Sequence, residues 1–270
     1  MAERVPGRGI HRRPQHLPAA AGFSGIEAGG GAARGNGRLN PRGVLEGRQS
    51  WRRLLFLHWP VPPDALRGVV PREFPLDLRD GAGWVTIIAF DIRSARPPFV
   101  PARLGIDFLE TNVRTYVRLA GGEPAIWFFS LEASSAPAVA AARLAYGLPY
   151  WLARMARDAE PGVDVYRTIR RGAPGAPGLE VRYRVGPPRG TAAPGSLDEF
   201  LIERYVLHVV RRGEVRSVRV RHRPYPLRDV EVVSVEEDLL AAGGVERPDA
   251  APLAHFSDGV DVDVLRIVGG

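Results

Sequence analysis

Five polar side chains of different chemistry occupy every second position between residues 110 and 118. They are Glu110, Asn112, Arg114, Tyr116 and Arg118. Because successive side chains of a strand point to opposite faces, an extended strand places all five on one face. The intervening residues, mostly threonine and valine, lie on the other face and can enter a core. A carboxyl, an amide, a phenol and two guanidinium groups thus share one surface.

Two interpretations of this polar face stay open. One face of an antiparallel sheet commonly meets water, and the set would then be a solvated surface. The segment that follows, residues 126–131, is apolar on both faces, which instead indicates a sheet covered on both sides. In that case the polar set lines the interior of a small barrel, which can enclose a cavity of ligand size.

Inside such a cavity the polar set predicts a site for a small organic acid or a carbonyl compound. Arg114 offers a planar fork to a carboxylate or phosphate, and Glu110 either neutralises it or acts as a base with a raised pKa. Tyr116 and Tyr150 can donate hydrogen bonds. Apolar wall would come from Trp127, Phe129 and Trp151. The alternative is an internal ion pair of Glu110 with Arg114 that fixes the strand and binds nothing.

The elements that must position these residues are many short strands and few short helices. Alternation, turn signals and capping residues predict helices near 63–67, along the Ala-rich run after residue 134, at 197–203 and at 236–242. They predict the other strands at 51–59, 84–92, 163–169, 179–185, 205–210, 215–221, 228–235 and 260–268. We therefore expect an α+β, mainly antiparallel β fold, and not a doubly wound nucleotide-binding fold.

The first fifty residues differ in composition from the rest. Residues 1–50 are rich in Gly, Ala, Pro and Arg, with little apolar periodicity, and predict a disordered tail ahead of a single domain at 51–270. This tail holds eight Arg against three Glu, which accounts for five of the seven net positive charges. A translation start near Val44 would remove most of it, which an intact mass of the native protein would test.

Composition and motifs exclude several kinds of chemistry. Cysteine is absent, which removes disulfides, thiolate nucleophiles and thiolate metal sites, and all 37 Lys and Arg residues are arginine. A P-loop needs lysine, and no G-x-S-x-G or strand-linked G-x-G-x-x-G motif occurs. The six histidines lack metal-ligand spacing. We expect no metal and no cofactor. No secretory signal or apolar run of membrane-spanning length is present, which predicts a cytoplasmic protein without a membrane partner.

Nucleic-acid binding is a minority interpretation. Arg219, Arg221 and Arg223 alternate on one face of a predicted hairpin beside His222 and Tyr225. The nearly neutral body argues against phosphate binding there, although the basic tail could attract nucleic acid weakly. The oligomeric state is left open.

With these residues in view, the sequence resembles the uncharacterised YqjF-like family of bacterial proteins. The resemblance rests on motifs that run in order from about Trp51 to the end of the chain. They are FLHWPVPPDALRGVVP from Phe56, ETNVRTYV from Glu110, WFFSLEA from Trp127, YGLPY from Tyr146, FLIERY from Phe200, RPYPLRDVEV from Arg223 and HFSDGVDVDV from His255. His58, Tyr205 and His255 lie in or beside these motifs and are further ligand-binding candidates, although a core role for His58 is the simpler interpretation.

This family is similar in fold to acetoacetate decarboxylase, which implies a β-barrel with small peripheral helices around a cavity. In that enzyme an Ala-rich helix leads into a segment with two lysines, the first forming a Schiff base and the second lowering its pKa. The comparable segment here is YGLPYW, so Tyr150 and Trp151 replace the lysines. Guanidinium stays protonated and cannot form an imine, so the resemblance implies a cavity without Schiff-base decarboxylation.

Three functions from different classes follow. The first is a small-molecule-binding barrel, which is an enzyme if Glu110 or another group acts on the ligand. The second is a non-catalytic structural or interaction protein whose cavity is filled by its own side chains. The third is weak nucleic-acid binding through the Arg-rich tail.

Overall fold

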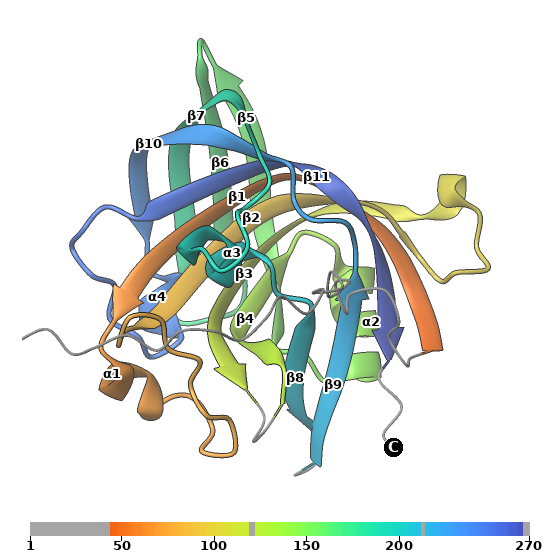
Figure 1. The fold of residues 1–270 in the computed structure, drawn as a ribbon. Helices are drawn as coiled ribbons and strands as arrows, with labels where there is room; N and C mark the ends of the chain where they lie inside the picture. Colours follow the sequence, from red (N-terminus) through yellow and green to blue (C-terminus); the bar gives the residue numbers. More distant parts are fainter. Residues whose placement is uncertain (1–43, 119–121, 212–213, 267–270) are drawn as a thin grey trace, which may run out of the picture. The chain divides into compact units, whose positions relative to one another are not determined.

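The strands form one continuous sheet that closes on itself twice (Figure 1). The computed structural model describes residues 44–118, 122–211 and 214–266. A first ring runs from β1 through β7 and then through β10 and β11, which pairs with β1. A second ring uses β1 to β4 again, crosses from β4 to β8, and returns through β9 and β11. Figure 1 shows the two ends of this arrangement, with β6, β7 and β10 at the upper left and β8 and β9 below.

The eleven strands of the described sheet account for most of the fold. Strand pairs are antiparallel except for β4 with β5 and β4 with β8. The strands are β1 (Val44–Val61), β2 (Gly83–Arg96), β3 (Ile106–Arg118), β4 (Pro124–Ala133), β5 (Tyr150–Glu160), β6 (Val163–Arg170), β7 (Gly178–Gly190), β8 (Val206–Arg211), β9 (Glu214–Arg221), β10 (Leu227–Glu237) and β11 (Leu253–Arg266). The helices are α1 (Pro63–Arg67), the 3-10 turn η2 (Ala102–Leu104), α2 (Ala136–Tyr146), α3 (Leu197–Ile202) and α4 (Leu239–Ala242). The predicted α+β, mainly antiparallel architecture is confirmed.

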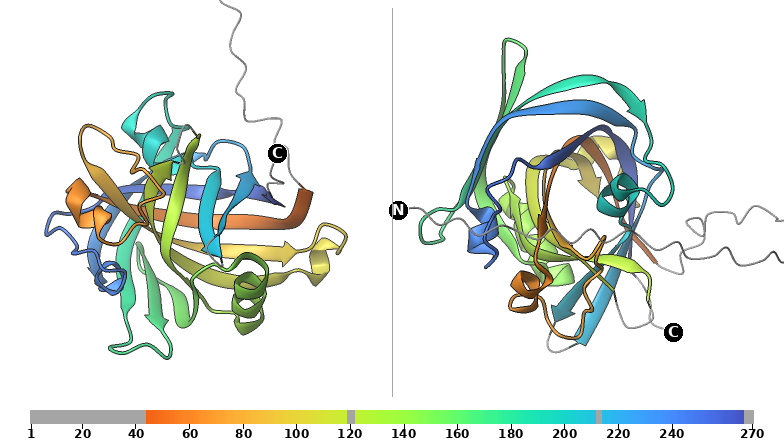
Figure 2. Two further views of the ribbon diagram at one scale, coloured as in Figure 1. Left: turned by 90° about the horizontal axis from the view of Figure 1, so that it is seen from below. Right: turned by 60° about the vertical axis from the view of Figure 1, so that its left-hand side comes forward.

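Each ring holds its own apolar core. The strands that belong to both rings, β1 to β4 and β11, form a shared wall that sends alternate side chains into the two cores. On β1, Leu55 and Leu57 enter the first core, while Leu54 and Phe56 enter the second. The strand can serve both cores because neighbouring side chains point to opposite faces. Figure 2 shows the sheet curving round on itself, with α3 lying against the second ring's side of the wall. Burial on both faces is what the apolar segment 126–131 predicted.

Two helices that border the second ring begin at serine caps, of which the Ser196 cap was expected from the sequence. Ser135 accepts a hydrogen bond from the backbone N–H of Ala138 at the start of α2, and Gly147 ends that helix with a left-handed φ of 70°. Ser196 accepts from the backbone N–H of Glu199 at the start of α3. Such caps satisfy N–H groups that lack partners in the first turn. They fix the two chain segments that lead into β5 and β8.

The largest differences between the structure and the predicted elements concern β1, β11 and β5. Strand β1 begins at Val44, so residues 44–50 belong to the sheet and not to the predicted tail, whereas residues 1–43 lie outside the described residues. Its early residues are polar but pair with the far end of β11, which itself begins at Leu253 instead of residue 260. Strand β5 was not predicted, because its alternating arginines hide the apolar period. In the described part of the chain, every helix is too short to cross a membrane.

Candidate functional site

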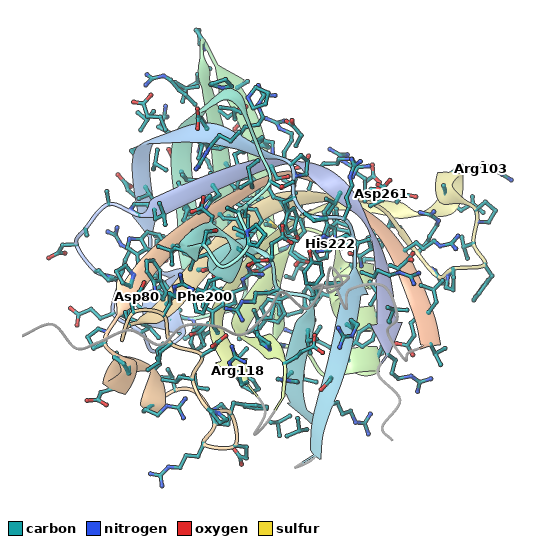
Figure 3. The ribbon with its side chains drawn as sticks, in the orientation of Figure 1. Asp80, Arg103, Arg118, Phe200, His222 and Asp261 are labelled. Atoms are coloured by element: carbon teal, nitrogen blue, oxygen red, sulfur yellow. The ribbon has the colours of Figure 1, made fainter. Side chains whose placement is uncertain are left out.

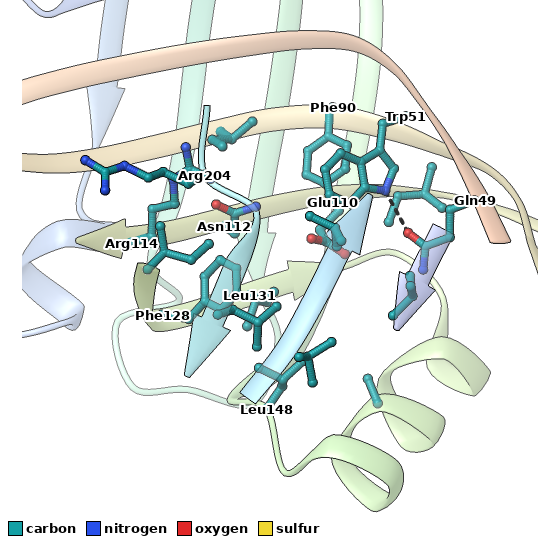
Figure 4. Close-up of a pocket in the computed structure, with 18 of the residues that line it drawn as sticks. Gln49, Trp51, Phe90, Glu110, Asn112, Arg114, Phe128, Leu131, Leu148 and Arg204 are labelled. Carbon is teal, nitrogen blue, oxygen red and sulfur yellow. Dashed lines mark hydrogen bonds between the residues drawn. The ribbon is translucent and has the colours of Figure 1, made fainter. Parts of the chain in front are cut away.

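A cavity of about 140 Å³ lies within the second ring (Figure 4). An engineered cavity of about 150 Å³ in another protein holds a benzene molecule, so this space suits about six non-hydrogen atoms. Most of its wall is apolar, and its polar side chains come mainly from β3 and from the segment after α3. The expectation of a cavity filled by the protein's own side chains is therefore not what the structure shows.

The cavity runs from a partly exposed end to a buried one. Gln49 and Tyr146, beside α2, are partly exposed, whereas Arg114 and Arg204 are 5% and 6% exposed. Figure 4 shows the two arginines together at the end away from Gln49, with Asn112 between them and Glu110. A strand rises about 3.3 Å per residue, so Glu110 and Arg114 stand about 13 Å apart along β3. The polar groups are spread over the cavity and do not form one cluster.

Arg114 brings a buried positive charge to the closed end without a carboxylate partner. Its Nη2 donates to the carbonyl oxygen of Leu201 at 3.1 Å, and its buried Nε has no hydrogen-bond partner. None of the ion pairs of the described residues includes Arg114, so the predicted pair with Glu110 does not form. An isolated buried guanidinium is unfavourable unless something compensates it. This arrangement leaves one face of the charge available to an anion.

Arg204, the neighbouring guanidinium, is already compensated. Its Nη1 lies 2.6 Å from Oδ2 of Asp77, and both side chains are buried. Its Nε donates to the carbonyl oxygen of Phe200, whose ring lies 4.3 Å from the guanidinium carbon. Phe200, labelled in Figure 3, also packs against Tyr116 with 5.1 Å between ring centroids. Arg204 therefore shapes the closed end but carries no unbalanced charge.

Glu110 brings a titratable carboxyl group to the other end. It is 4% exposed, and burial raises its pKa from 4.5 to about 7, although hydrogen bonds from Tyr150 and Asn112 oppose the shift. The Tyr150 hydroxyl donates to Glu110 Oε2 at 2.7 Å, and burial together with that carboxylate raises the pKa of Tyr150 well above 10.0. Near neutral pH Glu110 can accept or release a proton while Tyr150 stays a neutral donor.

Asn112 stands between these ends and presents an unused acceptor. Its Oδ1 is buried without a hydrogen-bond partner. Buried polar atoms normally have partners, so an orphaned amide oxygen beside open space indicates a position that a ligand or water would satisfy. Along the cavity, the polar face of β3 is thus buried and leaves the Asn112 oxygen and the Arg114 Nε without partners.

Five of the eleven candidates named from the sequence reach this cavity. The structure brings Glu110, Asn112, Arg114, Tyr150 and Tyr205 to its wall. It does not bring the other six there, namely Tyr116, Trp127, Phe129, Trp151, His58 and His255. Trp127 lies on the outer face of β4, and the cavity contact is made instead by Phe128, one residue on. Trp151 lies on the other face of β5, where Arg143 and Arg170 stack on its ring at 5.8 and 4.9 Å.

The histidines and Tyr116 form a separate hydrogen-bonded chain in the wall. His58 is fully buried, with Nδ1 2.8 Å from Thr86 Oγ1 and Nε2 3.1 Å from His255 Nδ1. Thr86 continues to the Tyr116 hydroxyl at 2.6 Å, and that hydroxyl donates to the Leu201 carbonyl that also holds Arg114. Burial lowers the pKa of His58 well below 6.5. His58 is the satisfied core histidine that the sequence favoured.

Sequence reasoning missed Arg204, which is buried in the structure. Its partner Asp77 is 127 positions away, and no local pattern signals that contact. Among the described residues no cluster of three or more His, Asp or Glu side chains could hold a metal ion.

Solved structures of similar fold define the class of protein. The enduracididine biosynthesis enzyme MppR, in complex with pyruvate, is 14% identical, with a TM-score of 0.56 over 86% of this chain and 91% of its own. Acetoacetate decarboxylase from Legionella pneumophila is 13% identical, with a TM-score of 0.55 over 88% of this chain and 93% of its own. At such identities the likeness shows the fold, which is acetoacetate decarboxylase-like.

The chain itself belongs to the DUF2071 family, described as "Uncharacterized conserved protein", whose model matches residues 48–261. It is 34% identical over 223 residues to the uncharacterized protein YqjF of Bacillus subtilis strain 168, which covers 82% of this chain and 91% of YqjF. The resemblance drawn from the sequence motifs is confirmed.

Proposed function

We propose that the protein binds a small organic acid, with its carboxylate at Arg114 and a carbonyl or hydroxyl group directed toward Asn112 and Glu110. The observation that carries the proposal is the buried Arg114 guanidinium without a carboxylate partner in the described structure. Arginine binds carboxylates through paired, charge-assisted hydrogen bonds. A carboxylate there would supply the missing partner for Nε.

The size and polarity of the cavity support an acid of about four carbons. The cavity has a volume of about 140 Å³. Its apolar wall would desolvate a short aliphatic chain, and includes Ile88, Phe90, Phe128, Leu131 and Leu148. The orphaned Asn112 oxygen and the Glu110 carboxyl group can contact a second polar group along the chain. One solved structure of similar fold is described as a complex with pyruvate, itself a small oxo acid.

Chemistry on this ligand would be a proton transfer and not an imine reaction. Glu110 has a pKa of about 7, which lets one carboxyl group serve as base and acid near neutral pH. No side chain supplies a primary amine. The solved proteins of similar fold include enzymes, and a reaction at Glu110 would make this protein one as well.

Calorimetry with two purified acids tests the proposal. We expect 2-oxobutyrate and butyrate to bind, and Arg114→Met to weaken both at least thirtyfold, because the loss of one charge-assisted pair is worth about 2 kcal/mol or more. Arg103→Met, in the exposed η2 turn labelled in Figure 3, is the matched control and should bind as the wild type does. Equal binding by Arg114→Met and the wild type would remove Arg114 from the site and refute the proposal.

A further inference from the structure

The described sheet is split beside the cavity. Strand β4 pairs with β8 at Ile126 and Trp127, and with β5 from Leu131 onward. Between these pairings, residues 128–130 have no strand partner on this side in the described structure. A sheet without a gap would close the wall by hydrogen bonds between strands, whereas here the Phe128 side chain and residues 147–149 close it.

A groove bordered by apolar side chains and by His208 lies on the outside of this split. It has a volume of about 400 Å³ and is bordered by Val69, Trp127, Phe129, Val210 and Ala242. Phe128 lines both this groove and the cavity. Leu148 lines the cavity, while its two chain neighbours, Gly147 and Pro149, line the groove. One layer of side chains therefore separates the two spaces.

The separating layer lies next to the closed end of the cavity. Phe128 is the residue that pairs with Arg114 across β3 and β4. Directly paired residues on neighbouring strands have Cβ atoms about 5 Å apart. A ligand whose carboxylate is held by Arg114 thus has its chain beside Phe128. The cavity itself has room for only about six non-hydrogen atoms.

We propose that the outer groove is a second subsite for the same ligand, and that the protein accepts carboxylic acids whose apolar chain is too long for the cavity. The carboxylate binds at Arg114, the chain passes through the split as Phe128 turns aside, and the far end packs against Trp127, Phe129 and Val210. This inference rests on the proposed function, since it needs the carboxylate at Arg114. It assigns the ligand class as unbranched aliphatic acids of about eight carbons.

Calorimetry with butyrate and octanoate on the full chain tests the second subsite. Burial of the four additional methylenes of octanoate should make octanoate bind at least tenfold more tightly than butyrate. Val210→Trp fills the groove from a position that is 39% exposed, and should remove this advantage while leaving butyrate affinity unchanged. Val233→Trp on β10, with a side chain 43% exposed and outside the groove, is the matched control and should keep the advantage.

A second variant tests the split directly. Phe128→Ala removes the aromatic side chain that separates the two spaces, and should raise the preference for octanoate further. If this core variant does not fold, Val210→Trp on the exposed side still tests the second subsite. A wild-type ratio of octanoate to butyrate affinity in Val210→Trp would overturn the second subsite. A second outcome would also overturn it. If Ala142→Trp, at the partly exposed end of the cavity, loses the octanoate advantage while Val210→Trp keeps it, the aliphatic chain leaves the cavity by the exposed end.

Failure of the two proposals can be told apart. If butyrate still binds through Arg114 while groove substitutions have no effect, only the second subsite is refuted. If Arg114→Met leaves butyrate binding unchanged, the proposed function fails and the second subsite fails with it.

Discussion

The Tyr150 hydroxyl, at the start of β5, donates a hydrogen bond of 2.7 Å to Oε2 of Glu110 on the polar face of β3. The resemblance to acetoacetate decarboxylase implies that Tyr150 stands where that enzyme carries the lysine that forms its imine. In this chain the position carries a neutral phenol that donates to a carboxylate. The chemistry proposed for the cavity is therefore proton exchange and not imine formation.

Glu110 should make stability fall as pH rises through neutrality. The unfolded residue ionises near 4.5 and the folded one near 7, so between these values the folded state binds a proton that the unfolded state has released. The contribution of Glu110 to the free energy of unfolding is therefore largest below pH 4.5, and it decreases as pH rises to about 7. The shift corresponds to roughly 3 kcal/mol. Glu110→Gln should gain about 2–3 kcal/mol relative to the wild type between pH 5 and pH 8 in urea unfolding.

The control for this pH dependence is Glu231→Gln, an exposed carboxylate paired with Arg184. It should show the same pH dependence as the wild type. If the difference between wild type and Glu110→Gln is constant from pH 5 to pH 8, the carboxyl group is not buried as described.

Tyr150→Phe should raise the pKa of Glu110 above 7. Removal of the hydroxyl takes away a donor that favours the ionised carboxylate, while burial remains. The variant should lose about 2 kcal/mol of stability at pH 8, where the bond is to a charged group, and less at pH 5. Carbon-13 NMR of the Glu110 carboxyl group measures the midpoint. Tyr225→Phe, in the same cavity, should leave it unchanged, and a lower midpoint in Tyr150→Phe would contradict the hydrogen bond.

The shared polar face could be predicted because it depends on one local rule. Alternation along β3 places Glu110, Asn112 and Arg114 together whatever the strand pairs with. The same rule explains why Trp127 does not line the cavity. Neighbouring residues of β4 point to opposite faces, and Phe128 is the one that faces the cavity. Residue types alone did not distinguish neighbours that are both aromatic.

The remaining features depend on contacts between distant parts of the chain. Arg204 is buried because Asp77 pairs with it, and the first part of β1 is a strand because β11 pairs with it. Neither partner lies within the windows from which local patterns are read. The double closure of the sheet also depends on a crossing from β4 to β8 at two residue pairs, which no periodicity signals.

The two arginines of the closed end should respond oppositely to removal of their charge. Arg114→Met replaces a buried guanidinium that has no carboxylate partner in the described structure, and should leave stability unchanged or raise it by about 1 kcal/mol. Arg204→Met leaves Asp77 buried with only the half-exposed Arg118 beside it, and should cost about 2–3 kcal/mol. Urea unfolding without ligand measures both. Equal destabilisation by the two variants would mean that Arg114 has a compensating partner.

The wild-type protein should not form an imine with oxo acids. Borohydride treatment in the presence of pyruvate reduces any imine to a stable secondary amine, which adds mass to the modified peptide. No side chain in the sequence offers a primary amine. Mass spectrometry of peptides from residues 44–266 should therefore show no adduct. An adduct on any of these peptides would refute the exclusion of Schiff-base chemistry.

A lysine at position 150 should restore imine formation, and the effect should depend on Glu110. In Tyr150→Lys the new ammonium group lies beside Glu110, which favours its charged form and keeps it a poor nucleophile. In Tyr150→Lys with Glu110→Gln that carboxylate is gone, while burial in the cavity lowers the lysine pKa. We expect a borohydride-trapped pyruvate adduct at residue 150 in the double variant, and at least tenfold less in the single variant. Val233→Lys, an exposed lysine of ordinary pKa, controls for non-specific reduction. Equal trapping in all three variants would show that the cavity contributes nothing to the reactivity of the amine.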